Sequence, residues 1–133
     1  MIYCADTWFV LAAFDRDPKA TQMLRGLQAG KDFLIVSYIV YSETFRKLYQ
    51  RGIAEIDIQS FFGFLERTEK VQFIPLNDRI GREAAKISLT YSLSLIDACV
   101  VATAKMLDCD ILLSKDSDYE LLTKRKYLKV QSW

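Results

Sequence analysis

The chain contains 133 residues, of which 51% are hydrophobic and 26% are charged, and its formal net charge is +1. This size predicts one globular domain, residues 1–133, and the nearly neutral charge means that only a local group of lysines and arginines can attract phosphates. No stretch reaches the roughly 18 apolar residues of a membrane span, and Asp6 interrupts the apolar start, so we expect no leader, no membrane contact and a cytoplasmic location.

Short apolar runs alternate with helical patterns along the chain. In chain order we expect a strand at 2–6, helices at about 7–14 and 18–28, a strand at 33–37, helices at about 38–51 and 56–68, a strand at 71–74, helices at about 78–91 and 94–108, a strand at 110–114, a short helix near 117–124 and a strand at 127–130. Such alternation predicts βαβ units. The expected fold class is α/β, a three-layer α/β/α sandwich with a central parallel sheet and a cleft at the carboxyl ends of its strands.

Histidine is absent from the sequence. Its absence excludes imidazole acid–base catalysis, catalytic triads that contain histidine, and histidine-ligated metals. The three cysteines, Cys4, Cys99 and Cys109, form no C-x-x-C pair and are expected to be small buried side chains. Any chemistry must therefore use carboxylates, hydroxyls, lysine, thiol or a metal bound by oxygen.

Four isolated carboxylates lie in or beside apolar stretches. Asp6 closes the first predicted strand, Asp116 follows the run 111–113 by three residues, and Asp97 lies in the first turn of a nearly all-apolar helix; the fourth is Glu43. An unpaired carboxylate is costly to remove from water, and several that converge make a site for a hard divalent metal. We therefore expect these acids to meet in one pocket.

Two of the acids also suit helix caps. Asp6 precedes a helix, where Asp is a preferred N-cap, and Asp97 completes a possible capping box with Ser94. However, the helix after Asp97 is apolar around its whole circumference and must be buried. A carboxylate at its entrance cannot simply face bulk water, which favours a metal-binding role for Asp97.

The segment 114–120 contains two further aspartates. A capping box formed by Ser117 and Glu120 would explain those residues, and the helix dipole would favour Asp118. This interpretation leaves Asp116 unexplained. Asp116 is therefore the better candidate ligand, with Asp118 as an additional or supporting group.

Glu43 has two interpretations. Its helix carries an apolar stripe formed by Tyr38, Tyr41, Phe45, Leu48 and Tyr49. Glu43 lies on the opposite side, near Arg46 and Lys47. If the stripe is core, Glu43 faces solvent; if Glu43 faces a cleft, the aromatic stripe can meet another protein chain. The spacing leaves both open.

These motifs together resemble the PIN-domain nucleases, and most closely the VapC toxins of prokaryotic toxin–antitoxin pairs. The segment 3–7 resembles the opening strand with the first metal-binding Asp, and 41–44 resembles the helical segment with the family's Glu. The segment 95–98 is similar to the Asp-Ala block, and 112–119 is similar to the strand that ends in Thr/Ser-x-Asp-x-Asp-Phe. Three residues depart from the family pattern: Trp8, where a small polar residue is frequent, Ser114 in place of Thr, and Tyr119 in place of Phe.

The resemblance implies an endoribonuclease that hydrolyses RNA to leave 5′-phosphate and 3′-hydroxyl ends. Its implied catalytic residues and metal ligands are Asp6, Glu43, Asp97 and Asp116, with Asp118 as a further ligand. Because oxygen is the only donor available, Mg²⁺ or Mn²⁺ is the expected ion. Thr7 and Ser114 are expected to orient the ligands by hydrogen bonds. The residues expected to hold the RNA backbone are Arg16, Arg46, Lys47 and Lys115.

The resemblance also implies a homodimer and a cognate VapB-type antitoxin. For part of such an interface we consider the stripe Tyr38, Tyr41, Phe45 and Tyr49. Further candidates lie in the next helix: Phe61, Phe62, Phe64 and Leu65, at least half of which are expected in the core.

Other functions fit the sequence less well. The main alternative is a PIN-like module that binds RNA or protein without cutting. A receiver domain or a haloacid-dehalogenase-type phosphatase needs further acids near the first strand, where Asp6 is followed by Thr7 and Trp8. Nucleotide-binding enzymes lack support because neither G-x-G-x-x-G nor a Walker motif is present.

Overall fold

The computed structural model describes all residues, 1–133, as a sheet of parallel strands covered by helices. The strands are β1 (Ile2–Ala5), β2 (Phe33–Ser37), β3 (Val71–Ile74), β4 (Ile111–Leu113) and β5 (Lys129–Gln131). The helices are α1 (Thr7–Phe14), α2 (Pro18–Ala29), α3 (Tyr38–Gln50), α4 (Glu55–Glu66), α5 (Asp78–Tyr91), α6 (Leu95–Met106), the 3-10 turn η1 (Ser117–Tyr119) and α7 (Glu120–Lys124). Every element predicted from the sequence is present, with ends that differ by one or two residues.

The strand order is β3-β2-β1-β4-β5, and every neighbouring pair is parallel. In the centre, Tyr3 of β1 lies opposite Leu34 of β2 on one side and opposite Ile111 of β4 on the other. The chain moves outward from β1 to β3 and then crosses back to β4, so its direction through the sheet reverses beside β1. In open α/β sheets, ligands bind at the carboxyl ends of the strands at such a reversal.

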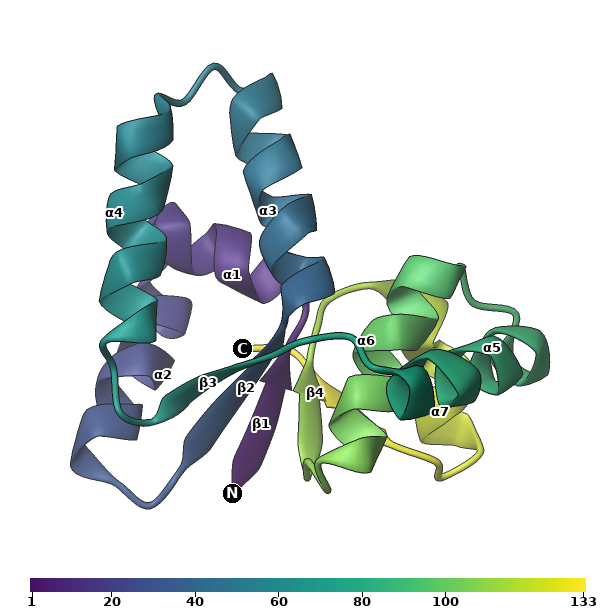
Figure 1. Ribbon diagram of the computed structural model, residues 1–133. Helices are drawn as coiled ribbons and strands as arrows, with labels where there is room; N and C mark the ends of the chain where they lie inside the picture. The colour runs from purple at the N-terminus through teal and green to yellow at the C-terminus, as the bar shows by residue number, and fades with distance from the viewer.

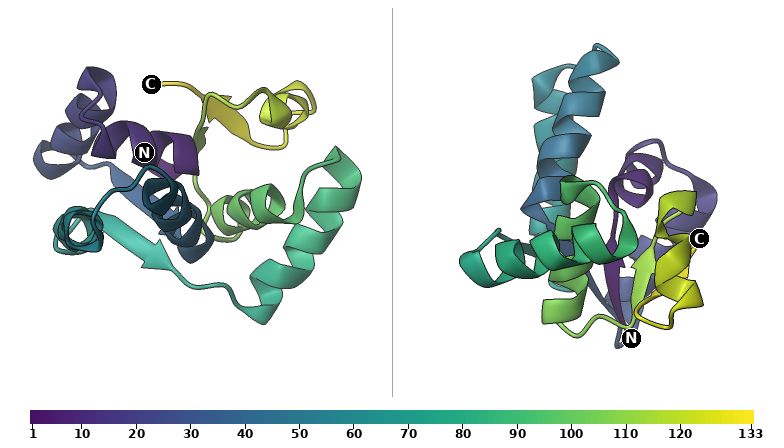
Figure 2. Two further views of the ribbon diagram at one scale, coloured as in Figure 1. Left: turned by 90° about the horizontal axis from the view of Figure 1, so that it is seen from above. Right: turned by 90° about the vertical axis from the view of Figure 1, so that its right-hand side faces the viewer.

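The helices form two outer layers. Seen from above, α1 and α2 lie on one side of the sheet and α5 and α6 on the other (Figure 2). Helices α3 and α4 form an antiparallel pair that projects beyond the carboxyl ends of the strands (Figure 1). The predicted α/β/α sandwich is therefore confirmed.

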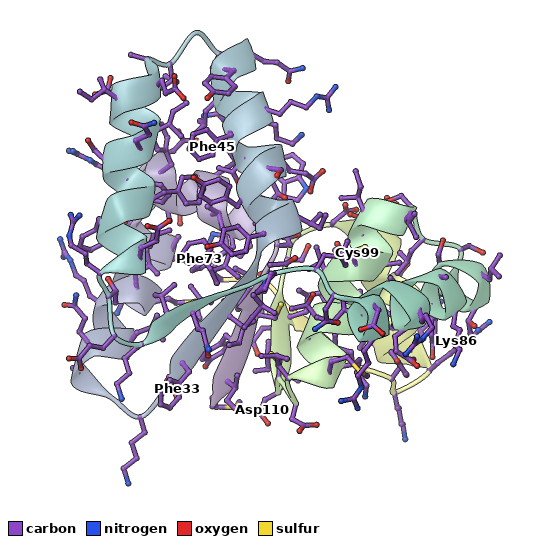
Figure 3. The ribbon with its side chains drawn as sticks, viewed as in Figure 1. Phe33, Phe45, Phe73, Lys86, Cys99 and Asp110 are labelled. Carbon is purple, nitrogen blue, oxygen red and sulfur yellow. The ribbon has the colours of Figure 1, made fainter.

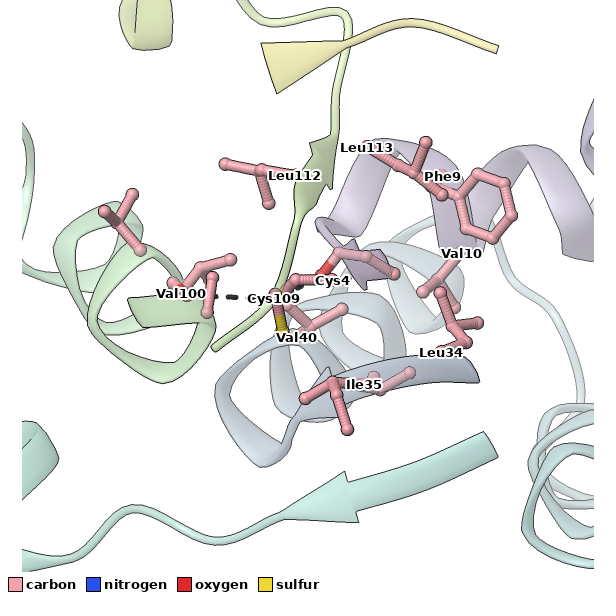
Figure 4. Packing of buried hydrophobic residues seen from close by; sticks show 14 of the residues in the cluster. Cys4, Phe9, Val10, Leu34, Ile35, Val40, Val100, Cys109, Leu112 and Leu113 are labelled. Atoms are coloured by element: carbon pink, nitrogen blue, oxygen red, sulfur yellow. Dashed lines mark hydrogen bonds between the residues drawn. The ribbon is translucent and has the colours of Figure 1, made fainter. Parts of the chain in front are cut away.

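The core includes a tightly packed part between α6 and the central strands. Figure 4 shows Cys4 of β1 beside Val100 of α6 and Leu112 of β4, all buried. Every residue of α6 from Ala98 to Ala104 is buried, as its uniformly apolar sequence predicts. The three cysteines are free and buried, which confirms their prediction as buried thiols.

No single helix has the length and apolar composition that a membrane crossing requires. Helices α5 and α6 satisfy that requirement only as a pair, and they are bent by 116° where they meet.

The aromatic stripe of α3 packs mainly within the molecule. The ring centroids of Tyr41 and Phe62 are 4.6 Å apart, and Phe45 stacks on Phe62 at 5.1 Å. Phe73 of β3 approaches Tyr41 from a third side, at 6.1 Å (Figure 3). Tyr41 and Phe45 therefore pack on α4 and β3 but remain partly exposed. Their contact with another chain stays a prediction.

The exposed aromatic side chains of this region lie at its rim. Tyr38 is 42% exposed and Tyr49 is 49% exposed. In α4, Phe62 and Leu65 are buried and Phe61 is partly buried, whereas Phe64 is 49% exposed. The expectation that at least half of the α4 residues belong to the core is confirmed.

We expect replacement of Tyr41 and Phe45 by Ser to destabilise the monomer, because the change removes two rings that pack on Phe62. The loss should be on the order of 3 kcal/mol in the free energy of unfolding, measured by urea denaturation. Tyr49→Ser, at the exposed rim, is the control and should cost much less. An unchanged urea midpoint together with a smaller mass in solution would contradict this assignment.

Candidate metal centre

Asp6 lies where the parallel strands β1 and β4 end together. Its backbone N–H continues the ladder by donating to the Leu113 carbonyl at 3.2 Å. The carboxylate is buried and caps α1, with the Phe9 N–H donating to Oδ1 at 3.1 Å. The Ser114 hydroxyl, at the end of β4, donates to Oδ2. Asp6 is therefore both the helix cap considered from the sequence and a fixed carboxylate at the sheet reversal.

Asp97, Asp116 and Asp118 form a compact group. One carboxylate oxygen of each lies within 4.8 Å of the others. The Asp97 N–H donates to the Ser94 hydroxyl at 3.2 Å, so Ser94 caps α6 as expected. The Tyr119 hydroxyl donates to Asp97 Oδ1 at 3.2 Å and holds that carboxylate toward the group.

Asp116 is positioned by the turn that follows β4. Its N–H donates to the Ser114 hydroxyl at 3.0 Å, and its Oδ1 accepts from the Asp118 N–H at 2.9 Å. Asp116 is thus the N-cap of η1. The sequence suggested Ser117 as the cap instead, which is wrong because the short turn begins one residue earlier.

Glu43 faces α1. Its Oε1 accepts a hydrogen bond from the Thr7 hydroxyl at 2.7 Å, and the side chain is only partly exposed. The sequence offered a choice between a solvated Glu43 and an aromatic stripe that meets another chain. The structure shows a third arrangement, in which neither side of the helix is free, because α3 contacts α1 and α6 as well as α4. The stripe packs on α4 while Glu43 points to the site.

Mutual repulsion and burial link the four predicted ligands. Burial raises the pKa of Asp6 to about 6. The charge of Asp116 adds to this rise, whereas hydrogen bonds from Ser114 and from the backbone of Phe9 and Trp8 oppose it. Burial also raises the pKa of Asp97, with smaller contributions from the charges of Asp116 and Glu43. The ionised forms of Asp6 and Asp97 are therefore disfavoured unless a cation is bound.

The donor set suits a hard divalent ion. All the side chains offered are carboxylates, and oxygen ligands are those that Mg²⁺ and Mn²⁺ prefer. Asp97, Asp116 and Asp118 would hold such an ion, because one carboxylate oxygen of each lies within 4.8 Å of the others. The residues present therefore fit a divalent metal.

The predicted RNA-binding residues do not all lie near the acids. Lys47 is one helical turn beyond Glu43, and its Nζ lies 5.9 Å from the centre of the Trp8 ring. Arg46 is exposed on the same helix. Lys115 directly precedes Asp116, and its Nζ lies 4.5 Å from the Trp133 ring centre.

Arg16 lies beyond the end of α1 that is opposite to Asp6. It follows α1 in a left-handed conformation (φ 58°) and lines a cavity of about 1020 Å³ formed with residues of α2 and α4. The length of α1, about 12 Å at 1.5 Å per residue, separates it from Asp6. A contact between Arg16 and RNA, if made, would therefore lie away from the acids, and this role stays a prediction.

Tyr119 is a site residue that the sequence analysis missed. Its side chain is 2% exposed, and burial raises the pKa of its hydroxyl well above the usual range, so the group stays protonated and donates to Asp97. The signal was present in the sequence as a Tyr where the related motif has Phe, since a buried Tyr hydroxyl needs a partner.

The PIN-domain family model matches residues 3–124, and the chain therefore belongs to the PIN-domain family. A search of curated protein sequences found no significant match to this chain.

Among solved structures, the fold is similar to that of VapBC2 from Rickettsia felis bound to a promoter DNA fragment (TM-score 0.76, 14% identity, 100% of this chain and 99% of that chain). It is also similar to VapBC-1 from nontypeable Haemophilus influenzae (0.74, 20%, 100% and 98%). A third similar structure is Mycobacterium tuberculosis VapC20, a toxin that cleaves the sarcin–ricin loop (0.71, 16%, 91% and 94%). The chain thus has the PIN fold found in VapC-type toxins.

The raised pKa of Asp6 predicts how the stability of the metal-free protein depends on pH. The pKa is about 6 in the fold, whereas the ordinary value for an aspartate is 3.8. The stabilising effect of protonation is therefore complete below about pH 4 and is lost as the pH rises through about 6. The loss is about 3 kcal/mol at neutral pH. Thermal melts in EDTA from pH 4 to 7 should show the protein losing stability relative to Asp6→Asn, which keeps a helix cap without titrating. Parallel profiles would contradict this.

Tyr119→Phe should weaken Mg²⁺ or Mn²⁺ binding about tenfold or more, because the hydroxyl no longer orients Asp97. The ring remains, so the melting temperature without metal should change little. Titration calorimetry measures the affinity. Tyr127→Phe is the matched control, because Tyr127 contacts Lys105 in the last turn of α6, at the other end of that helix from Asp97. Equal affinities for Tyr119→Phe and the unaltered protein would exclude the positioning role.

Proposed function

We propose that this protein is a divalent-metal-dependent endoribonuclease that hydrolyses RNA phosphodiester bonds and acts as the toxin of a toxin–antitoxin pair in the cytoplasm. The observation that carries the proposal is the group formed by Asp97, Asp116 and Asp118, whose carboxylate oxygens lie within 4.8 Å of one another. Asp6 and Glu43 are outside this group but close enough for charge effects, because Asp116 raises the pKa of Asp6 and Glu43 raises that of Asp97. Membership of the PIN-domain family and the similarity to VapC structures support it.

The proposed ligands are Asp6, Glu43, Asp97, Asp116 and Asp118. A bound Mg²⁺ or Mn²⁺ would polarise the phosphodiester and lower the pKa of the attacking water. The chain supplies negative charge that is already fixed in place, so little rearrangement is needed when a cation and a phosphate arrive. Burial strengthens this attraction, because charges interact more strongly where water is excluded.

Hydrogen bonds from neighbouring hydroxyls keep the ligands oriented. Ser114 holds Asp6, Thr7 holds Glu43 at 2.7 Å, and Tyr119 holds Asp97 at 3.2 Å. Each hydroxyl donates its proton to a carboxylate and leaves other oxygen lone pairs for a cation. Such supporting bonds commonly matter for metal affinity as much as the ligands do.

A VapB-type antitoxin and a second copy of the chain are the proposed partners. Three of the similar structures carry VapBC or toxin–antitoxin names, which supports an antitoxin partner. The proposed interface includes the stripe predicted from the sequence: Tyr38 and Tyr49 are its exposed residues, and Tyr41 and Phe45 are partly buried beside them.

The test of the nuclease proposal is RNA cleavage in Mg²⁺ or Mn²⁺. An RNA that contains the sarcin–ricin loop is a suitable first substrate, because the similar VapC20 cleaves that loop. We expect products with 5′-phosphate ends, and we expect Asp97→Asn and Asp116→Asn to reduce the rate roughly 100-fold or more. EDTA should abolish cleavage.

The control is Asp78→Asn, which removes an exposed acid that pairs with Arg82 on α5, outside the acidic group. Its cleavage rate should equal that of the unaltered protein. Mg²⁺ should also raise the melting temperature of the protein but not that of Asp116→Asn. RNA binding without any cleavage would favour the alternative function, a non-catalytic PIN-like RNA- or protein-binding module.

A further inference from the structure

Trp8 is an exposed aromatic residue close to two of the acids, Asp6 and Glu43. It is 54% exposed in the first turn of α1. It directly follows Thr7, whose hydroxyl donates to Glu43, and it is two residues from the buried Asp6. An indole of this exposure adds little to the core, unlike Trp133, which packs edge-on against buried Phe9 at 5.3 Å between ring centroids. The position of Trp8 therefore needs another explanation.

A lysine lies against the Trp8 ring. Lys47 Nζ is 5.9 Å from the ring centre, at the outer limit of a cation–π contact. Lys47 is four residues after Glu43, so the two side chains lie on the same side of α3. The site thus has, side by side, carboxylates that suit a metal, a flat aromatic surface and a cation that suits a phosphate.

We propose that Trp8 stacks an unpaired RNA base next to the phosphate that is cut, while Lys47 contacts the adjoining phosphate. The proposal rests on the nuclease function proposed above and assigns to Trp8 and Lys47 the positioning of an unpaired nucleotide beside the cut phosphate. Proteins read unpaired RNA by stacking its splayed bases on aromatic side chains.

Charge considerations favour stacking at this site. The net charge of +1 gives little general attraction for RNA, and the acidic group repels phosphates until a cation is bound. Stacking on an indole supplies affinity that does not depend on charge and holds the nucleotide in place. A base-paired nucleotide cannot offer its face to Trp8, so this contact selects unpaired RNA.

The experiment measures binding of a fluorescein-labelled, unstructured 12-nucleotide RNA by anisotropy in Mg²⁺. The binding measurements use an Asp97→Asn background to limit cleavage, and cleavage is measured separately in proteins that keep Asp97. We expect Trp8→Ala to weaken binding about tenfold or more, whereas Trp8→Phe should retain most of the affinity. A hairpin RNA whose nucleotides are all paired or constrained should bind weakly and should not distinguish these variants.

The chain offers a matched control. Phe33 is 44% exposed, and Lys70 Nζ lies 4.5 Å from its ring centre, so this pair resembles Trp8 and Lys47. Phe33 begins β2, at the amino end of the sheet, away from the acids (Figure 3). Phe33→Ala should leave RNA affinity unchanged. Melting temperatures of all variants show whether an effect on binding reflects loss of folding.

The results separate this proposal from the nuclease proposal. If the unaltered protein cleaves RNA but Trp8→Ala binds and cleaves as well as it does, stacking is refuted and the nuclease function stands. If nothing is cleaved but binding depends on Trp8, the nuclease function fails and RNA stacking stands. Equal losses for Trp8→Ala and Trp8→Phe, or an equal loss for Phe33→Ala, would also overturn the stacking role.

Discussion

The parallel pairing of β1 with β4 is the constraint on which the candidate site depends. These strands are more than one hundred residues apart in the sequence, yet Tyr3 lies opposite Ile111 and Ala5 opposite Leu113. The ladder continues one step further, where Asp6 donates to the Leu113 carbonyl and accepts from the Ser114 hydroxyl. Because both strands end there, the turns that carry Asp6 and Asp116 begin at the same edge of the sheet. A shift of register by one residue would turn these side chains to opposite faces.

This arrangement places function in opposition to stability. Burial and like charges raise the pKa of both Asp6 and Asp97, which means that the ionised forms are disfavoured in the fold. Three hydroxyls, from Thr7, Ser114 and Tyr119, partly compensate by donating to the carboxylates. Burial of the apolar core around Cys4, α6 and the central strands stabilises the fold and offsets the remaining repulsion among the carboxylates.

Helix α3 shows how one element serves both purposes. Its buried residues, Val40, Thr44 and Leu48, fix the helix against the rest of the molecule. On one side its aromatic rings pack on α4, and on another Glu43 reaches Thr7. Lys47 continues the latter side to the exposed Trp8. The packing of the aromatic side therefore determines where Glu43 and Lys47 point.

The sequence by itself determined the α/β class, the succession of elements and the identity of the candidate acids, because these follow from local periodicity and from carboxylates in apolar surroundings. It also determined that α6 is buried, since its sequence is apolar on every side. Only the tertiary structure decided the strand order, the direction of Glu43, the separation of Arg16 from the acids and the bond from Tyr119 to Asp97. Each of these depends on contacts between segments distant in the chain, about which the local pattern carries no information.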